Sequence, residues 1–81
     1  MKERLINVQK KGEYYVIAVI EPSGEVNMDI GIHKTDNAFA AAMFIHGLLL
    51  VWHGLIHIHP KCVDTYSSLN DVVADYMRRN P

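Results

Sequence analysis

The first part of the chain alternates apolar and polar side chains in three short segments. These segments cover residues 5–9, 14–21 and 25–32. A period of two residues is typical of β-strands with one buried face, and the second segment is also rich in β-branched and aromatic residues. The third segment has the most regular alternation. We therefore predict an antiparallel β-meander over residues 1–33.

Two short loops, each ending in glycine, separate the three segments. The loops are residues 10–12 and 22–24. Three residues with glycine last are typical of a type I turn followed by a left-handed residue. With loops of this length, Gln9 faces Glu13 and Glu21 faces Glu25. This register predicts one apolar face formed by Ile6, Val8, Tyr14, Val16, Ala18, Ile20, Val26, Met28, Ile30 and Ile32. A two-residue first loop would move the apolar residues of the first strand to the other face.

The opposite face of this sheet is not wholly polar in the predicted register. It carries Leu5, Tyr15, Ile17 and Val19. The solvated face of an antiparallel sheet is normally polar, so a central apolar stripe indicates a contact surface. We interpret these four residues as part of a candidate interaction surface.

A long segment without charged side chains follows. Residues 37–60 contain no Asp, Glu, Lys or Arg. Thr35 is a suitable N-cap and Asp36 suits the first turn of a helix. Gly54 is suitably placed at the C-terminal end. We predict a core helix over residues 35–54.

The predicted core helix carries small residues at regular spacing and is apolar on all sides. Ala40, Gly47 and Gly54 recur every seven residues. Glycine inside a helix costs about 1 kcal/mol relative to alanine, so Gly47 indicates close packing against another backbone. One sheet face cannot cover an all-apolar helix, which predicts a further buried contact. Trp52 suits such a contact, because it is large and has one hydrogen-bond donor, and it completes the candidate interaction surface.

Two further segments follow the core helix. Residues 55–59 alternate again and end at Pro60, so they either form an edge strand or continue the helix. Residues 68–80 have a capped start and helical spacing, and we predict a short C-terminal helix there. The prediction is a single α+β domain over residues 1–81, in the order βββαβα. A small antiparallel sheet of three or four strands is packed on one face by the long apolar helix and the short C-terminal helix.

Composition narrows the function classes. The chain has 81 residues, a formal net charge of −1 and one cysteine, so no internal disulfide can form. Basic and acidic residues are mixed along the chain, which argues against nucleic-acid binding through bulk electrostatics. The first residues lack the apolar stretch of a secretory signal, and we expect a cytoplasmic protein.

Four of the five histidines lie close together in the sequence, at His46, His53, His57 and His59. On a continued helix the first three share one stripe, whereas on a strand the last two share one face. Either arrangement could bind a transition metal. The segment has no HExxH or CxxC motif and no carboxylate. Histidine-mediated metal binding or sensing is therefore an alternative function, and the main interpretation includes no cofactor.

No catalytic motif is present, and we do not expect an enzyme. Cys62 and Asp64 do not resemble a nucleophile elbow or a cysteine-enzyme signature. A small single-span membrane protein is a second alternative, because the uncharged segment is long enough to span a bilayer. Moving it into lipid would leave the apolar sheet face uncovered.

The excess apolar surface favours association with another protein. We predict a small non-enzymatic interaction domain that forms a homodimer and binds a larger protein partner, occluding or bridging it. Phage-encoded inhibitors of host enzymes or defence systems are an analogy that rests on size and on the absence of a catalytic motif.

Overall fold

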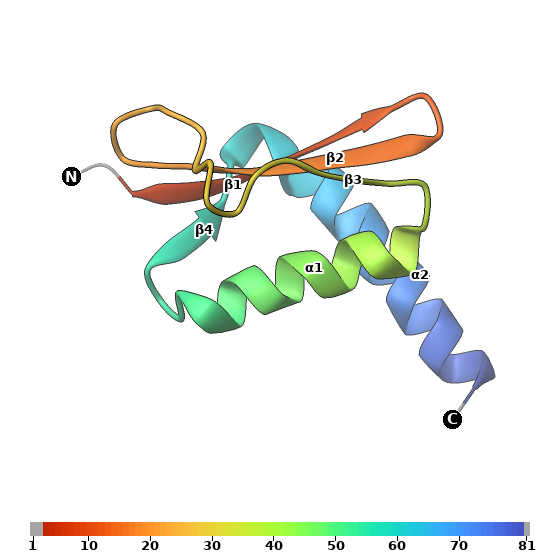
Figure 1. Ribbon diagram of the computed structural model, residues 1–81. Helices are drawn as coiled ribbons and strands as arrows, with labels where there is room; N and C mark the ends of the chain where they lie inside the picture. The colour runs from red at the N-terminus through yellow and green to blue at the C-terminus, as the bar shows by residue number, and fades with distance from the viewer. Residues whose placement is uncertain (1–2, 81) are drawn as a thin grey trace.

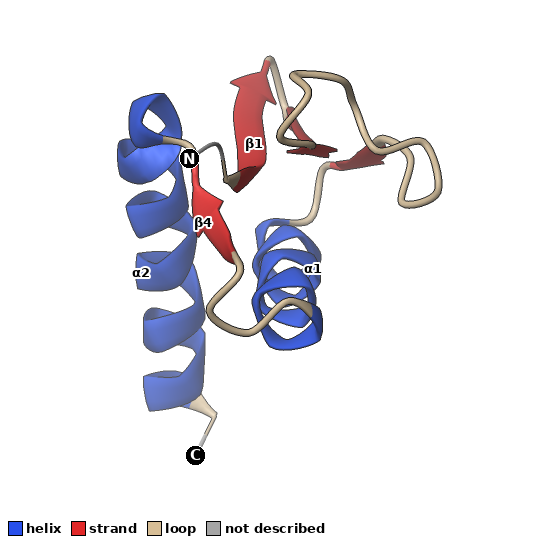
Figure 2. Ribbon diagram, turned by 90° about the vertical axis from the view of Figure 1, so that its left-hand side faces the viewer, coloured by secondary structure: helices blue, strands red, loops and turns tan. Residues whose placement is uncertain are grey.

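The hairpin of β1 (Arg4–Lys11) and β2 (Tyr14–Ile20) is the centre of the fold. The computed structural model describes residues 3–80. β3 (His33–Thr35) pairs with β2 at one edge of the sheet, and β4 (Ile56–Ile58) pairs with β1 at the other. Two helices, α1 (Ala38–Val51) and α2 (Val63–Arg79), lie on the same side of this sheet (Figures 1 and 2). The predicted α+β class and the element order βββαβα are confirmed.

The sheet is mixed rather than wholly antiparallel. β4 runs parallel to β1, with Leu5 opposite His57, and therefore residues 55–59 do not continue the helix. Parallel strands need a crossover connection. α1 provides it, because it carries the chain from β3 at one edge of the sheet to β4 at the other (Figure 1).

The predicted register of the first hairpin is wrong. Lys11 pairs with Tyr14, so the loop is the two residues Gly12 and Glu13. Gly12 has a φ of 61°, in the left-handed region, and a type II′ hairpin turn requires glycine at its first central position. The pairing of β1 with β2 differs from the predicted pairing by an odd number of residues. β2 therefore turns towards the helices the face that was predicted to point away from them.

The second loop follows the prediction, but the third strand does not. The Glu21 N–H donates to the Glu25 carbonyl at 2.8 Å, as a loop over residues 22–24 requires. The pairing then stops after an isolated bridge at Val26. The Asn27 side chain accepts from the Ile30 N–H at 2.9 Å, which favours a turn over an extended strand. The predicted strand over residues 25–32 is therefore replaced by a loop and the short β3.

Both helices differ from their predicted bounds. Asn37, not Thr35, is the N-cap of α1, and its side chain accepts from the Ala40 N–H at 3.0 Å. α2 begins at Val63 instead of residue 68, because a 3-10 turn, η1 (Pro60–Cys62), leads directly into it. Proline is favoured at the first position of such a turn, since its missing N–H needs no partner there.

The core lies between the sheet and the two helices. Its sheet side consists of Ile6, Val8, Ile17, Val19 and Ile56. α1 packs Ala41, Ala42, Ile45 and Leu48 against them, and α2 adds Leu69. The small side chains of Ala41 and Ala42, both fully buried, let α1 lie close to the strands.

A bidentate ion pair joins the start of β1 to the end of β2. Arg4 donates from Nε and Nη2 to the two carboxylate oxygens of Glu21 at 2.8 and 2.9 Å. Asn27 donates to the same carboxylate at 3.2 Å, and the Arg4 guanidinium lies 4.8 Å from the centre of the Trp52 ring. The hydrogen bond from Arg4 is the main cause that lowers the pKa of Glu21 below its ordinary value, and partial burial opposes it.

This ion pair predicts a loss of stability in acid. The folded state lowers the pKa of Glu21. The contribution of this carboxylate to the free energy of unfolding is therefore present above its pKa in the unfolded chain, about 4.3, and is lost as the pH falls through its pKa in the folded state. Urea unfolding from neutral pH downward should show a steeper fall for the wild type than for Glu21→Gln. The exposed carboxylate of Glu25 is the matched control, and Glu25→Gln should keep the wild-type profile. Identical profiles for the wild type and Glu21→Gln would contradict the expectation.

Candidate functional site

One side of α1 is apolar and has no partner within the described chain. The buried residues of the helix lie on the side that faces the sheet. At 100° per residue, the opposite side carries a set that we call the α1 outer face: Ala40, Met43, Gly47, Leu50 and Val51. The exposed fractions of the three larger side chains are 41% for Met43, 74% for Leu50 and 71% for Val51.

Nothing within residues 3–80 requires glycine at position 47. A Cβ atom built there would meet no heavy atom within 4 Å, and Gly47 does not have a positive φ. Glycine in a helix interior nevertheless costs about 1 kcal/mol relative to alanine. The packing reason expected for Gly47 therefore does not lie within residues 3–80, and Gly47 instead leaves a shallow strip on the outer face between Met43 and Leu50.

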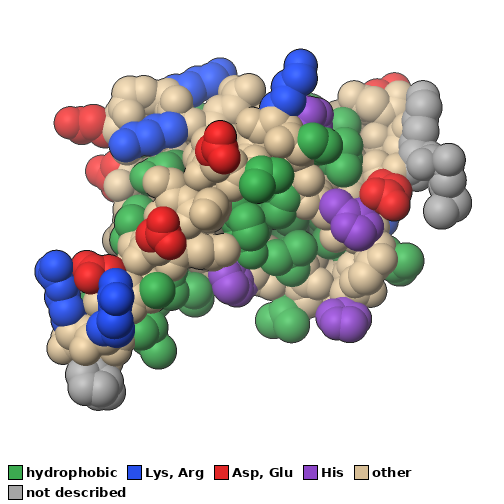
Figure 3. Space-filling model, turned by 180° about the vertical axis from the view of Figure 1, so that it is seen from behind, with side chains coloured by type: hydrophobic (Ala, Val, Ile, Leu, Met, Phe, Trp, Pro, Cys, Tyr) green, Lys and Arg blue, Asp and Glu red, His purple; other side chains and the backbone are tan. Residues whose placement is uncertain are grey.

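Exposed apolar side chains continue from the α1 outer face onto neighbouring segments. Leu55 follows the helix and is largely exposed, and α2 exposes Val72, Tyr76 and Met77. The Phe39 and Tyr76 rings lie 5.0 Å apart and join the two helices. Seen from behind, from the side on which α2 lies, hydrophobic side chains also gather in the middle of the molecule with histidines around them (Figure 3). Single exposed apolar residues are ordinary, but a contiguous group on an uncharged helix indicates a contact surface.

The predicted interaction surface on the sheet does not exist as one surface. Ile17 and Val19 are 0% exposed, because the true register turns them towards the helices. Tyr15 shares their face and is half-buried beside Lys10. Leu5 lies on the opposite face and is half-buried. Trp52 is the C-cap residue of α1, and it is half-buried under Arg4 and packed against the core.

The structure also separates the four candidate metal ligands. His46 contacts Asn70, His57 contacts Glu3, His59 accepts from the Lys61 N–H, and His53 is exposed. Within the described part of the chain, no group of three or more His, Cys, Asp or Glu side chains is placed to hold a metal ion. His46 and Asn70 instead form a polar contact of 3.3 Å between α1 and α2.

Cys62 is a buried side chain, and its thiol contacts a neighbouring strand. Its Sγ donates to the Asn7 side-chain oxygen at 3.4 Å. Cys62 is 4% exposed and belongs to the hydrophobic core, which is typical of a cysteine that packs as a small apolar residue. We therefore assign Cys62 to the packing of η1 against β1.

The uncharged segment of residues 37–60 does not form a transmembrane helix. None of the helices within residues 3–80 combines the length and the apolar character needed to cross a bilayer.

The sequence carries part of the signal for the α1 outer face, in the small residues and the excess apolar surface of the predicted helix. The seven-residue spacing of Ala40 and Gly47 runs along the centre of this face. Comparison with protein-family models, curated proteins and solved structures found no match to this chain.

Proposed function

We propose that the protein is a small non-enzymatic interaction domain that pairs with a second copy of itself through the α1 outer face and binds a larger protein as a dimer. The single observation that carries this proposal is the exposed, uncharged outer face of α1. Met43 and Leu50 present large apolar side chains on either side of Gly47.

The absence of charge makes a second copy a suitable occupant of this face. α1 has no Asp, Glu, Lys or Arg, so two copies can meet without like-charge repulsion and without burying an unpaired ion. A face with fixed charges would instead require a partner of opposite charge. An isologous contact also suits the short helix, since every favourable contact occurs twice.

Antiparallel pairing gives the outer face a matching partner. A two-fold axis passing between positions 46 and 47 places Met43 of one copy opposite Leu50 of the other, and Gly47 close to its counterpart. The α1 helix has 14 residues and is about 21 Å long, so the contact includes its whole outer face. Small residues at the crossing point let the two backbones approach closely.

The pairing is tested by placing a charge on the outer face. Leu50→Glu would bury an unpaired carboxylate in the contact, and we expect the dissociation constant of the dimer to rise at least 100-fold, about 2.7 kcal/mol. Sedimentation equilibrium over a range of protein concentrations measures it. Val63→Glu is the matched control, because Val63 is also an exposed apolar residue but lies in the first turn of α2. A monomeric wild-type protein, or a dimer that tolerates Leu50→Glu, would refute the proposal.

A companion variant separates self-association from effects on folding. In Gly47→Ala the added methyl group meets no heavy atom of the described residues within 4 Å, so the helix itself should gain up to about 1 kcal/mol. The same methyl group separates the two helices at their crossing point, and the dimer should weaken. Opposite signs for unfolding of the monomer and for dimer dissociation are expected only if Gly47 lies in the contact.

A dimer of this kind keeps the sheet edges available for another protein. The β1–β2 hairpin lies on the opposite side of α1 from its outer face, because the buried residues of α1 pack towards the core beside this hairpin (Figure 1). Two equal sites related by a two-fold axis can bridge two partner molecules or bind one symmetric partner, which supports the proposed role in occlusion or bridging.

A further inference from the structure

β1 extends beyond the end of β4 and leaves the second half of its outer edge open. β4 pairs only with Arg4, Leu5 and Ile6. The chain then turns away from the sheet at Pro60. Residues 7–11 of β1 therefore have β2 on one side and no strand on the other.

Backbone hydrogen-bonding groups point outward along this open edge. The His59 N–H donates to the Ile6 carbonyl at 2.9 Å, so the backbone groups of Ile6 face away from β2. These groups alternate sides along a strand, and those of Val8 and Lys10 therefore point the same way. Outside the regular ladders, no backbone hydrogen bond engages Val8 or Lys10 within residues 3–80. Unpaired strand edges are templates for a further strand.

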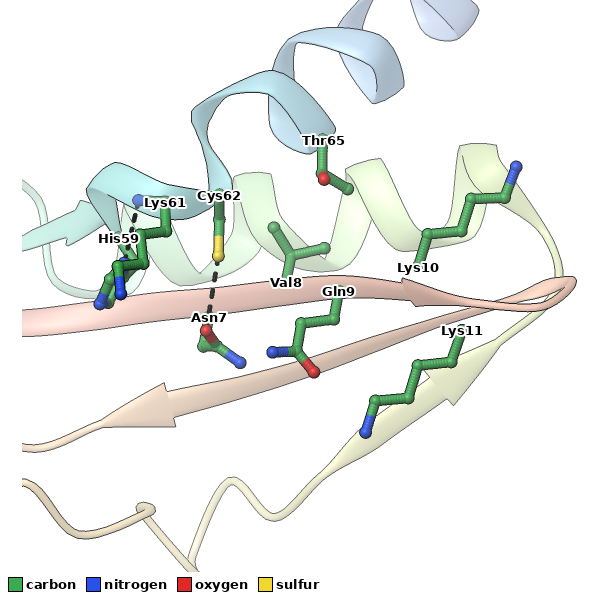
Figure 4. Close-up of a pocket in the computed structure, with 9 residues that line it drawn as sticks. All are labelled: Asn7, Val8, Gln9, Lys10, Lys11, His59, Lys61, Cys62 and Thr65. Carbon is green, nitrogen blue, oxygen red and sulfur yellow. Dashed lines mark hydrogen bonds between the residues drawn. The ribbon is translucent and has the colours of Figure 1, made fainter.

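A cavity of about 480 Å³ runs beside this edge and is open to solvent (Figure 4). The strand forms one wall, and Cys62 and Thr65 form the other. The edge is therefore bordered by space rather than covered by α2.

The charge around the cavity is positive and spread out. Lys10, Lys11 and Lys61 line it, and none of its described lining residues is Asp or Glu. Lys10 and Lys11 extend to opposite sides of β1, whereas Lys61 lies at the other end beside His59 (Figure 4). Asp64 borders the adjoining hollow. Ammonium groups that point apart do not enclose a compact anion, but they can contact successive acidic side chains of an extended ligand.

We propose that the open edge of β1 binds an extended acidic peptide segment of a partner protein, which adds to the sheet as a further strand. The backbone groups of Val8 and Lys10 pair with the peptide backbone, and the lysines select Asp and Glu side chains on both faces of the added strand. A second copy of β1 does not suit this edge, because it would bring Lys10 and Lys11 against lysines of the same kind. This inference rests on the proposed function in one respect, namely that the protein acts by binding another protein.

The binding is tested with synthetic octapeptides in which pairs of glutamates alternate with pairs drawn from valine, isoleucine, threonine and tyrosine, so that each face of the extended peptide carries glutamate. Fluorescence anisotropy measures their affinity for the full chain, and amide hydrogen exchange followed by NMR reports on individual backbone groups. We expect the Val8 and Lys10 amides to gain protection when a peptide binds. A glutamate–proline octapeptide, with prolines in place of the uncharged pairs, has the same charge but lacks N–H groups on both edges of the strand, and it should bind at least ten-fold more weakly.

Charge reversal on the protein gives the second arm of the test. The double variant Lys10→Glu, Lys11→Glu should weaken binding at least ten-fold. Lys34→Glu is the matched control, because Lys34 lies on β3 at the opposite edge of the sheet, and it should bind like the wild type. The inference is overturned if no peptide of the panel protects these amides, if the glutamate–proline peptide binds equally well, or if an oligothymidylate binds more tightly than every peptide.

The two proposals fail in distinguishable ways. Sedimentation of the same samples reports whether the protein is a dimer. A dimer that binds no acidic peptide overturns the edge site alone, whereas a monomer that binds the peptide overturns the α1 contact alone.

Discussion

Ile17→Ala should destabilise the protein by about 2–4 kcal/mol, because it leaves a cavity at the centre of the core. Ile17 is 0% exposed and lies in β2 opposite Val8, under α1. A loss of this size is a large part of the stability of a small domain, which is typically 5–15 kcal/mol. Urea unfolding at fixed protein concentration measures it, because a dimer makes apparent stability depend on concentration.

The neighbouring residue supplies the control. Val16 points to the opposite face of β2 and is half-buried, so Val16→Ala should cost less than about 1.5 kcal/mol. The register predicted from a three-residue loop gives the reverse order, with Val16 in the core and Ile17 outside. A larger loss for Val16→Ala than for Ile17→Ala would therefore show that the described register is wrong.

The comparison of these two residues also explains why the register could not be predicted from the pattern of side chains. β2 reads YYVIAVI and is apolar at every position, so alternation within it does not identify the buried face. The predicted register then depends on the choice of loop, and the three-residue loop is favoured because it places Ile6 and Val8 on the same face as Val16. Gly12 is compatible with the end of a three-residue loop and with the start of a two-residue loop, and the latter matches the twist of the strands.

Elements with strong local signals were predicted better than those that depend on tertiary contacts. The uncharged helix and the turn at residues 22–24 follow from local chemistry, and both occur close to their predicted positions. The parallel pairing of β4 and the short β3 depend on where α1 takes the chain, which no local pattern specifies. Residues 25–32 alternate like a strand, but the side-chain hydrogen bond at Asn27 and the positive φ of Gly31 turn the chain instead.

The candidate site was only partly visible in the sequence for the same reason. The line of small residues at Ala40 and Gly47 was apparent, and so was the surplus of apolar surface on the helix. Which surface remains exposed depends on the hairpin register, and the incorrect register assigned Ile17 and Val19 to the contact surface. The open edge of β1 depends on the short length of β4, which becomes visible only in the assembled sheet.

Leu69→Ala is expected to detach much of α2 and to cost about 2–5 kcal/mol. Among the described residues of α2, Leu69 alone is buried, and it is 0% exposed. Tyr66 and Val73 pack beside it with partial burial. We expect amide protection in α2 to fall well before global unfolding, which hydrogen exchange measures. Met77→Ala on the same helix, where the side chain is 58% exposed, should change stability by less than about 0.5 kcal/mol.

Equal effects of Leu69→Ala and Met77→Ala would contradict this picture of how α2 is attached. The expected difference follows from the position of Leu69, which is in contact with the core, whereas the exposed second half of α2 extends past α1 (Figure 1). The segment just before Leu69 also forms a wall of the cavity beside β1, at Cys62 and Thr65. The packing of one leucine therefore holds α2 on the sheet and maintains the space beside the open edge of β1 in which a further strand can bind.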